Sequence, residues 1–88
     1  MISRATPGFW QCYGALTPEL QSAARGAYRR FLENPGHPGL RLERLRCDPR
    51  AWSVRVTQNC RAVALRNGET WIWIWIGSHQ EFDRRFPV

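Results

Sequence analysis

The sequence predicts an α+β fold in which two N-terminal helices cover one face of a small antiparallel sheet. Three observations carry this prediction. An apolar stripe at helical spacing occupies residues 20–32, turn signals separate several short strand-like runs after residue 40, and residues 71–76 alternate tryptophan with isoleucine. Successive strands joined by hairpins are antiparallel, so the helices that precede them must pack on one face of the sheet. We expect residues 1–88 to form a single domain.

The N-terminal third predicts a short strand and two helices. Residues 2–5 are expected to form the strand, and residues 7–15 a short amphipathic helix. The second helix begins after Thr17, which has the features of an N-cap, with Pro18 at the first helical position. Its apolar side chains recur every three or four residues and are Leu20, Ala23, Ala24, Ala27, Tyr28, Phe31 and Leu32. The turn residues 34–36 end this helix.

The rest of the chain predicts a run of strands separated by turns. The expected strands are residues 40–46, 52–56, 61–66 and 71–76. Asn67-Gly68 is a strong signal for a tight hairpin before the last strand. That strand carries indoles on one side and isoleucines on the other, so both of its faces are apolar. Two covered faces are typical of a central strand rather than an edge strand.

Parity along the strands assigns side chains to the two faces of the sheet. Small alanines let a helix approach closely, so the helix-covered face is expected to hold Ala62, Ala64, Ile72, Ile74 and Ile76. The opposite face then carries Arg55, Arg61 and the tryptophans of residues 71–76. His79 follows the glycine turn at the end of the last strand and lies at the rim of this face. The arginines are therefore predicted to converge beside the histidine.

The composition favours an anionic partner. The formal net charge is +6, and all 13 basic residues are arginines. Guanidinium groups bind phosphates in a bidentate way and do not deprotonate, which favours nucleic acid or an acidic protein. The alternative is a solvated basic surface without a specific partner.

The cysteines indicate neither a disulfide framework nor a metal site. Cys12, Cys47 and Cys60 are odd in number, form no Cys-x-x-Cys pair and have no histidine at metal spacing. We expect reduced cysteines, no metal and no cofactor. The N-terminal residues lack the apolar core of a signal peptide, and no run approaches the ~18 apolar residues of a membrane span. The expected location is therefore the cytoplasm, without membrane contact.

Several ordered segments resemble a RelE/ParE-type toxin of bacterial toxin–antitoxin systems. They are His-Pro-Gly-Leu-Arg-Leu-Glu-Arg-Leu at 37–45, Trp-Ser-Val-Arg-Val at 52–56, Arg61-Ala62 and Trp-Ile-Gly-Ser-His at 75–79. The resemblance implies two N-terminal helices on one face of a small sheet and a C-terminal helix near the other. It also implies a ribosome-dependent endoribonuclease that cuts messenger RNA, and a cognate antitoxin that silences it in a toxin–antitoxin hetero-oligomer. Other members of the superfamily poison DNA gyrase without catalysis, so superfamily membership leaves the target open.

The same resemblance assigns catalytic roles. In metal-free RNA cleavage the 2′-hydroxyl attacks the adjacent phosphate. The reaction needs a base for the hydroxyl, fixed positive charge for the transition state and an acid for the leaving oxygen. Arg61 stands where nuclease members keep a phosphate-stabilising arginine, and Arg55 where a basic residue helps to bind or activate the substrate. His79 stands where related nucleases place a proton-transfer residue. Glu81 and Asp83 either orient His79, supply the second proton-transfer group, or are charges on a helix surface.

The expected RNA-binding residues are Arg41, Arg44, Arg46, Trp73, Trp75 and Phe82. The three arginines would hold messenger or ribosomal phosphates, and the alternative is a basic edge strand protected against aggregation. The indoles would stack on unpaired bases, pack beneath the last helix, or contact an antitoxin segment. The antitoxin is expected to lay an acidic segment across the basic face.

The chain departs from the best-known nuclease pattern at two positions. Ser53 replaces an expected lysine, and a late tyrosine is absent, with Phe82 or Phe86 in its place. A weakened nuclease, or a different acid–base pair built around His79, is therefore an alternative to the standard site. Two further alternatives are a gyrase inhibitor and a catalytically degenerate basic interaction module.

Overall fold

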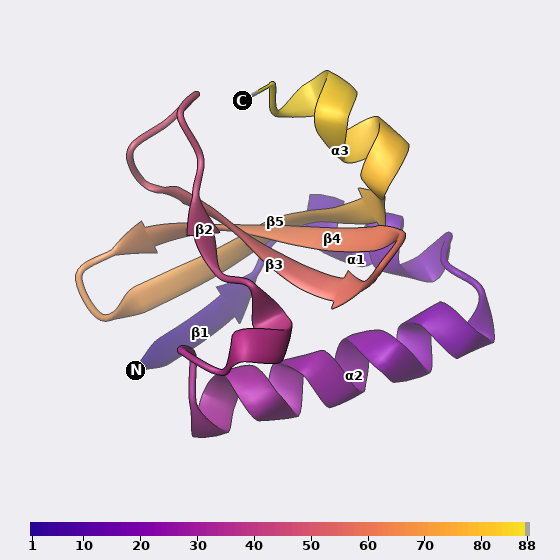
Figure 1. Ribbon diagram of the computed structural model, residues 1–88, viewed down its shortest axis with the longest axis horizontal. Coiled ribbons are helices and arrows are strands. Elements are labelled where there is room, and N and C mark those ends of the chain that lie inside the picture. The colour runs from indigo at the N-terminus through magenta and orange to yellow at the C-terminus, as the bar shows by residue number, and fades with distance from the viewer. Residues whose placement is uncertain (88) are drawn as a thin grey trace.

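A computed structural model describes residues 1–87 as a five-stranded sheet with α1 and α2 on one face and α3 on the other (Figure 1). In chain order the elements are β1 (Ile2–Ala5), α1 (Pro7–Gly14), α2 (Pro18–Glu33), a 3₁₀ turn η1 (Pro38–Leu40), β2 (Glu43–Arg44), β3 (Ala51–Thr57), β4 (Cys60–Asn67), β5 (Thr70–Ser78) and α3 (His79–Arg85). The strand order is β1-β5-β4-β3-β2. The α+β prediction is confirmed, with one addition: β1 joins the sheet parallel to β5, while the other pairs are antiparallel.

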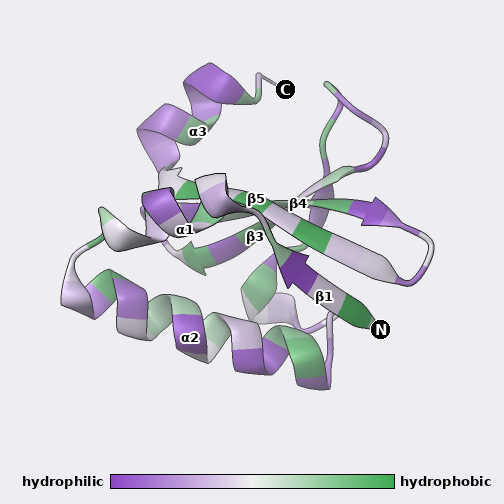
Figure 2. Cartoon of the chain, turned by 180° about the vertical axis from the view of Figure 1, so that it is seen from behind, coloured by the Kyte–Doolittle hydropathy of each residue, from purple (hydrophilic) through white to green (hydrophobic). Residues whose placement is uncertain are grey.

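The helices begin where the sequence places capping residues. The side-chain oxygen of Thr17 accepts a hydrogen bond from the backbone N–H of Leu20 at 3.3 Å, and Pro18 occupies the first turn. Thr6 caps α1 in the same way. Alternating hydrophobic and hydrophilic bands along α2 mark its apolar stripe in Figure 2. None of the helices within residues 1–87 is long and apolar enough to cross a membrane.

A β-bulge in β5 reverses the predicted orientation of two tryptophans. Val63 pairs with Trp75, but the next residue, Ala64, pairs with Trp73, so Ile74 is the extra residue of the bulge. Trp71 and Trp73 therefore share the helix-covered face with the alanines of β4, and only Trp75 lies on the opposite face. The prediction that all the tryptophans of 71–76 share the face of the arginines is wrong for the first two.

The isoleucines follow the same bulge. Ile76 packs beneath the helices as predicted. Ile74 packs against the cluster on the α3 side, and Ile72 pairs with Leu65, which also belongs to that cluster. The predicted placement is therefore wrong for Ile72 and Ile74. A single inserted residue changes parity for everything beyond it, because side chains alternate with period two.

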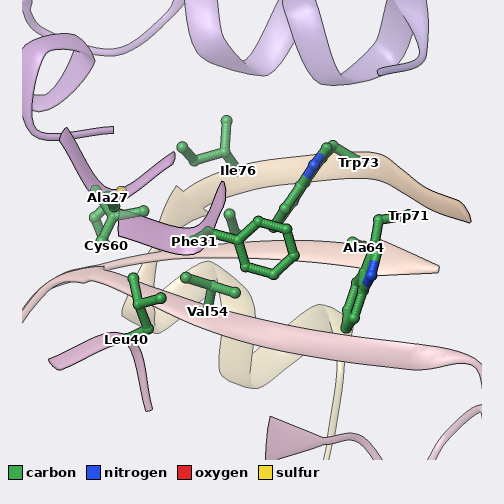
Figure 3. Close-up of a cluster of buried hydrophobic side chains, with 11 residues drawn as sticks. Ala27, Phe31, Leu40, Val54, Cys60, Ala64, Trp71, Trp73 and Ile76 are labelled. Carbon is green, nitrogen blue, oxygen red and sulfur yellow. The ribbon is translucent and has the colours of Figure 1, made fainter. Parts of the chain in front are cut away.

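The helix-covered core is built around Phe31. Its ring lies edge-to-face against both Trp71 and Trp73, with ring centroids 5.1 Å apart in each pair (Figure 3). The indole N–H of Trp73 donates to the hydroxyl of Ser3 at 3.0 Å, so its polar atom is satisfied. This contact also joins the edge strand β1 to the core.

The predicted strand 40–46 shrinks to the two residues of β2. Pro38 opens a 3₁₀ turn, and Arg41 then adopts a left-handed backbone with φ of 45°. Leu40 packs beneath α2, whereas Leu45 packs on the α3 side. The 3₁₀ turn and the left-handed Arg41 break the extended conformation, so only Glu43 and Arg44 pair with β3.

Candidate nucleic-acid interface

Two arginines and a glycine form one row across the sheet. Arg55 of β3 lies opposite Arg61 of β4, and Arg61 lies opposite Gly77 of β5. We call these residues the arginine row, and the sheet face that carries them the arginine face. Val54 and Ala62, adjacent to them in the strands, belong to the helix-covered core, so the two guanidinium-bearing side chains emerge on the other face, as predicted.

The arginine row holds like charges together. No carboxylate within residues 1–87 forms an ion pair with Arg55 or Arg61. Like charges directly opposite each other on paired strands are destabilising. The repulsion falls when an anion binds between them, and a phosphate oxygen pair fits the guanidinium fork.

The end of the β3–β4 hairpin holds the Arg61 side chain. Its Nη1 donates to the carbonyl oxygens of Thr57 at 2.7 Å and Cys60 at 3.1 Å, with a longer contact of 3.4 Å to Gln58. Its Nε and Nη2 donors have no acceptor within residues 1–87 and remain available to a ligand. Burial lowers the pKa of Arg61, and the charges of Arg55 and Arg41 lower it further. Because the ordinary pKa of arginine is so high, the group stays charged at neutral pH.

The predicted RNA-binding arginines are not equivalent. Arg41 follows η1 in a left-handed backbone conformation, and its charge acts on Arg61 and lowers the pKa of that group. Arg44 of β2 pairs with Trp52, which packs against the helix-covered core, so strand parity places Arg44 on the face opposite the arginine row. Arg46 follows β2 and is exposed. Arg41 therefore adds a third positive charge that acts on the arginine row, whereas Arg44 is directed away from it.

His79 begins α3 and is tied to the same hairpin. Its backbone N–H donates to the carbonyl oxygen of Asn59 at 2.8 Å, and the hydroxyl of Ser78 caps the helix by accepting from the N–H of Glu81 at 3.2 Å. The imidazole Nδ1 lies 3.3 Å from a carboxylate oxygen of Asp83, one helical turn later. This contact orients the ring and leaves Nε2 as its second polar atom.

The two acidic residues predicted beside His79 differ in role. Asp83 contacts the imidazole, and its negative charge also acts on Arg61. Glu81 instead pairs with Arg85 at 3.8 Å on the exposed side of α3. The geometry brings Asp83 to the candidate site and leaves Glu81 among the surface charges.

The aromatic residues predicted to stack on bases are buried. Trp73 is 7% exposed and lies beneath α2, on the far side of the sheet from the arginine row, so its predicted position on the arginine face is wrong. Trp75 and Phe82 are on the arginine face but each is only 6% exposed. They pack against each other and against Phe86. Packing beneath the last helix is thus the alternative that the structure favours.

Other chemistries find no support in the described chain. No group of three His, Cys, Asp or Glu side chains within residues 1–87 is arranged to hold a metal ion. Cys60 is fully buried, and burial raises the pKa of its thiol, which disfavours the nucleophilic thiolate. Sequence reasoning missed the contributions of Thr57 and Asn59, because both act through backbone carbonyl groups.

An apolar hollow opens on the opposite face of the sheet. It has a volume of about 400 Å³ and lies between α1, α2 and the strands. Its lining is mostly aromatic and aliphatic, and includes Phe9, Phe31 and Trp73, with Arg4 and Arg25 among its charged members. This hollow suits an apolar segment with acidic flanks better than a reacting phosphate.

A family model described as the ParE-like toxin domain matches residues 18–84. The chain belongs to the family of ParE-like toxin domains. It is thus a toxin of the kind that toxin–antitoxin systems contain, and the resemblance read from its sequence is confirmed at the level of the superfamily. No curated protein matches the chain.

Solved structures of low sequence identity share the fold of this ParE-like domain. A chain of the RelB–RelE antitoxin–toxin complex from Methanococcus jannaschii superimposes with a TM-score of 0.75 at 12% identity, covering 94% of this chain and 98% of that one. The YoeB/ParE toxin from Agrobacterium tumefaciens gives 0.69 at 21% identity, with 90% and 99% covered. A chain of the toxin–antitoxin complex RelBE2 from Mycobacterium tuberculosis gives 0.70 at 17% identity, with 89% and 96% covered. At these identities the likeness establishes the fold.

Proposed function

We propose that this ParE-like toxin is a metal-independent endoribonuclease that cleaves messenger RNA on the ribosome and so inhibits translation in the cytoplasm. The observation that carries the proposal is the uncompensated arginine row beside an imidazole that a carboxylate orients. A gyrase inhibitor needs a binding surface but no proton-transfer group beside its arginines.

The reaction is an intramolecular transesterification. The 2′-hydroxyl loses its proton to a base as its oxygen attacks the phosphorus, and the bond from phosphorus to the 5′-oxygen breaks. The leaving oxygen takes a proton, giving a 2′,3′-cyclic phosphate and a 5′-hydroxyl. Arg61 and Arg55 stabilise the dianionic transition state, and Arg41 holds an adjacent phosphate.

His79 is assigned to proton transfer in this scheme. Its ring is 43% exposed, so its Nε2 can reach a bound nucleotide, while Asp83 holds Nδ1. An imidazole serves as acid or base near neutral pH. The carboxylate of Asp83 is engaged with the imidazole, so the other proton transfer is assigned to the scissile phosphate itself or to solvent.

The test is primer extension of messenger ends after controlled expression, with and without translation. We expect new in-frame cuts only on translated messages, and their loss in His79→Ala. His37→Ala is the matched control, because His37 caps η1 and lies outside the arginine row. Cuts on untranslated RNA would support RNA cleavage but contradict its dependence on the ribosome. Growth arrest with intact messages would favour the gyrase inhibitor.

We also propose that a cognate antitoxin covers the toxin in a hetero-oligomer. The net charge of +6 favours an acidic partner segment, and the apolar hollow with Arg4 and Arg25 gives such a segment a place to bury apolar side chains. Arg25→Glu is expected to weaken protection by the co-expressed antitoxin while leaving messenger cleavage unchanged. Unaltered protection would place the antitoxin on the arginine face alone.

A further inference from the structure

Gly77 occupies a position at which any side chain would collide with an indole. A β-carbon added there would lie 2.6 Å from Cζ2 of Trp75 and 3.0 Å from its Cη2. Among residues 1–87 the glycine with a positive φ is Gly68, so Gly77 is needed for space and not for backbone conformation. The third position of the arginine row is thus filled by the ring of Trp75.

The indole of Trp75 is in turn the surface on which α3 rests. Its ring centroid lies 6.3 Å from that of Phe82 and 5.5 Å from that of Phe86, and it is buried between these rings and the sheet. The ring of His79 lies 6.1 Å from that of Phe82. A continuous set of ring contacts therefore runs from Gly77 through the indole to the imidazole.

The bulge in β5 separates Trp75 from the other tryptophans of the strand. Trp75 pairs with Val63 and shares its face, whereas the extra residue at Ile74 sets Trp73 opposite Ala64, on the helix-covered face. Trp75 is thus the tryptophan of this strand that supports α3, and the glycine two residues later leaves room for its ring.

We propose that Gly77 is a positioning residue for His79: its missing side chain lets Trp75 seat Phe82, and this sets the distance from the imidazole to the arginine row. The proposal rests on the nuclease function proposed above. An indole is rigid and cannot yield like the end of a flexible side chain, so a β-carbon at 2.6 Å must displace the ring and the helix upon it. Misplacement of a reacting group by about 1 Å is enough to cost ~10²-fold in rate.

The first test is Gly77→Ala in single-turnover cleavage of messenger RNA on ribosomes. We expect the maximal single-turnover rate to fall by ~10- to 10²-fold, with little change in the toxin concentration that gives half of this rate, because the arginines that hold the phosphate do not move. Gly14→Ala is the matched control, since nothing lies within 4 Å of an added β-carbon there, and it should keep the wild-type rate. A wild-type rate for Gly77→Ala would overturn the proposal.

Two double-mutant cycles separate positioning from general damage. If Gly77 acts through the imidazole, Gly77→Ala should cost nothing further in a His79→Ala background. It should also cost nothing further in a Trp75→Leu background, where the colliding atoms are absent. Additive losses in both backgrounds would contradict the proposal, because they would show that the alanine acts by another route.

A structural measurement keeps the inference independent of activity. In NMR spectra, Gly77→Ala should shift the imidazole resonances of His79 and the indole N–H of Trp75, while Gly14→Ala leaves both in place. Unshifted resonances would refute the contact path whether or not the chain is a nuclease. Shifted resonances in a chain that cleaves no RNA would refute the proposed function and retain the positioning contact.

Discussion

The sheet face beneath α1 and α2 is closed by aromatic and aliphatic side chains, whereas the face beneath α3 leaves guanidinium groups side by side. On the first face Phe31 is fully buried between Trp71 and Trp73. On the second, Arg55 and Arg61 lie opposite each other without an ion-pair partner in residues 1–87. One face maximises apolar contact and the other retains a repulsion, so stability and binding are assigned to opposite sides of one sheet.

Because the two faces differ in this way, substitutions on each face should affect either the free energy of unfolding or RNA cleavage, but not both equally. Changes on the helix-covered face should lower the free energy of unfolding and affect cleavage only through the folded fraction. Changes to the arginine row itself should lower cleavage and leave stability unchanged or raised. The following substitutions test the division.

Phe31→Ala should have the largest effect on stability. Removing a fully buried ring that contacts two indoles is expected to lower the free energy of unfolding by about 3–5 kcal/mol. Urea denaturation followed by tryptophan fluorescence measures this loss. Leu32→Ala, at an exposed neighbouring position, should stay within about 0.5 kcal/mol of the wild type. Equal losses in the two variants would show that Phe31 does not centre the core.

Arg61→Ala should have the largest effect on cleavage. Loss of a preorganised positive group is expected to lower kcat by ~10²–10³-fold, with the folded state retained. Arg61→Lys should recover only part of this, because an ammonium cannot reproduce the fork that the hairpin carbonyl groups hold. Arg29→Ala, on the exposed side of α2, is the control for loss of one positive charge. Equal cleavage by the Arg61 and Arg29 variants would remove Arg61 from the site.

Ser78→Ala and Thr17→Ala compare helix caps on the two faces. Each removes a hydroxyl that accepts a backbone N–H and should cost about 0.5–2 kcal/mol of helix stability. Only Ser78→Ala should also lower kcat, because fraying of α3 displaces His79. Circular dichroism and single-turnover cleavage measure the two effects. If Thr17→Ala lowered cleavage as much, the two faces would not be separable.

Arg55→Gln should have the smallest effect on stability, and of the opposite sign. Relief of the repulsion with Arg61 is expected to raise the free energy of unfolding by about 0.2–1 kcal/mol, while cleavage falls. The gain should shrink at high salt, which screens the repulsion. Arg44→Gln has no arginine opposite it on β3 and should show neither gain nor salt dependence. A destabilised Arg55→Gln would mean that the row is not under electrostatic strain.

Much of the fold could be read from local chemistry. Thr17 with Pro18 marks the start of α2, and Asn67-Gly68 marks the last hairpin, with Gly68 at φ of 62°. The common face of Arg55 and Arg61 followed from strand parity and is confirmed. These features depend on capping, turn geometry and alternation, which act within a few residues.

Tertiary structure decided the rest. The extra residue at Ile74 is invisible in a perfect Trp–Ile alternation, because its cause is the packing of Trp73 against Phe31 on one face and of Trp75 against Phe82 on the other. The position of the bulge thus depends on contacts between residues far apart in sequence, and strand parity alone therefore assigned Trp73 to the wrong face of the sheet.

The contents of the site divide in the same way. Local sequence was enough to predict the parts of the site: strands that carry arginines, a glycine after the last strand and a histidine that follows it. Three further features depend on the folded chain: the charge of Arg41 acts on Arg61, Asp83 contacts the imidazole of His79, and Gly77 lies against the ring of Trp75. The physical reason is that these distances depend on how a left-handed turn, a hairpin and a helix pack together, and no single segment contains that information.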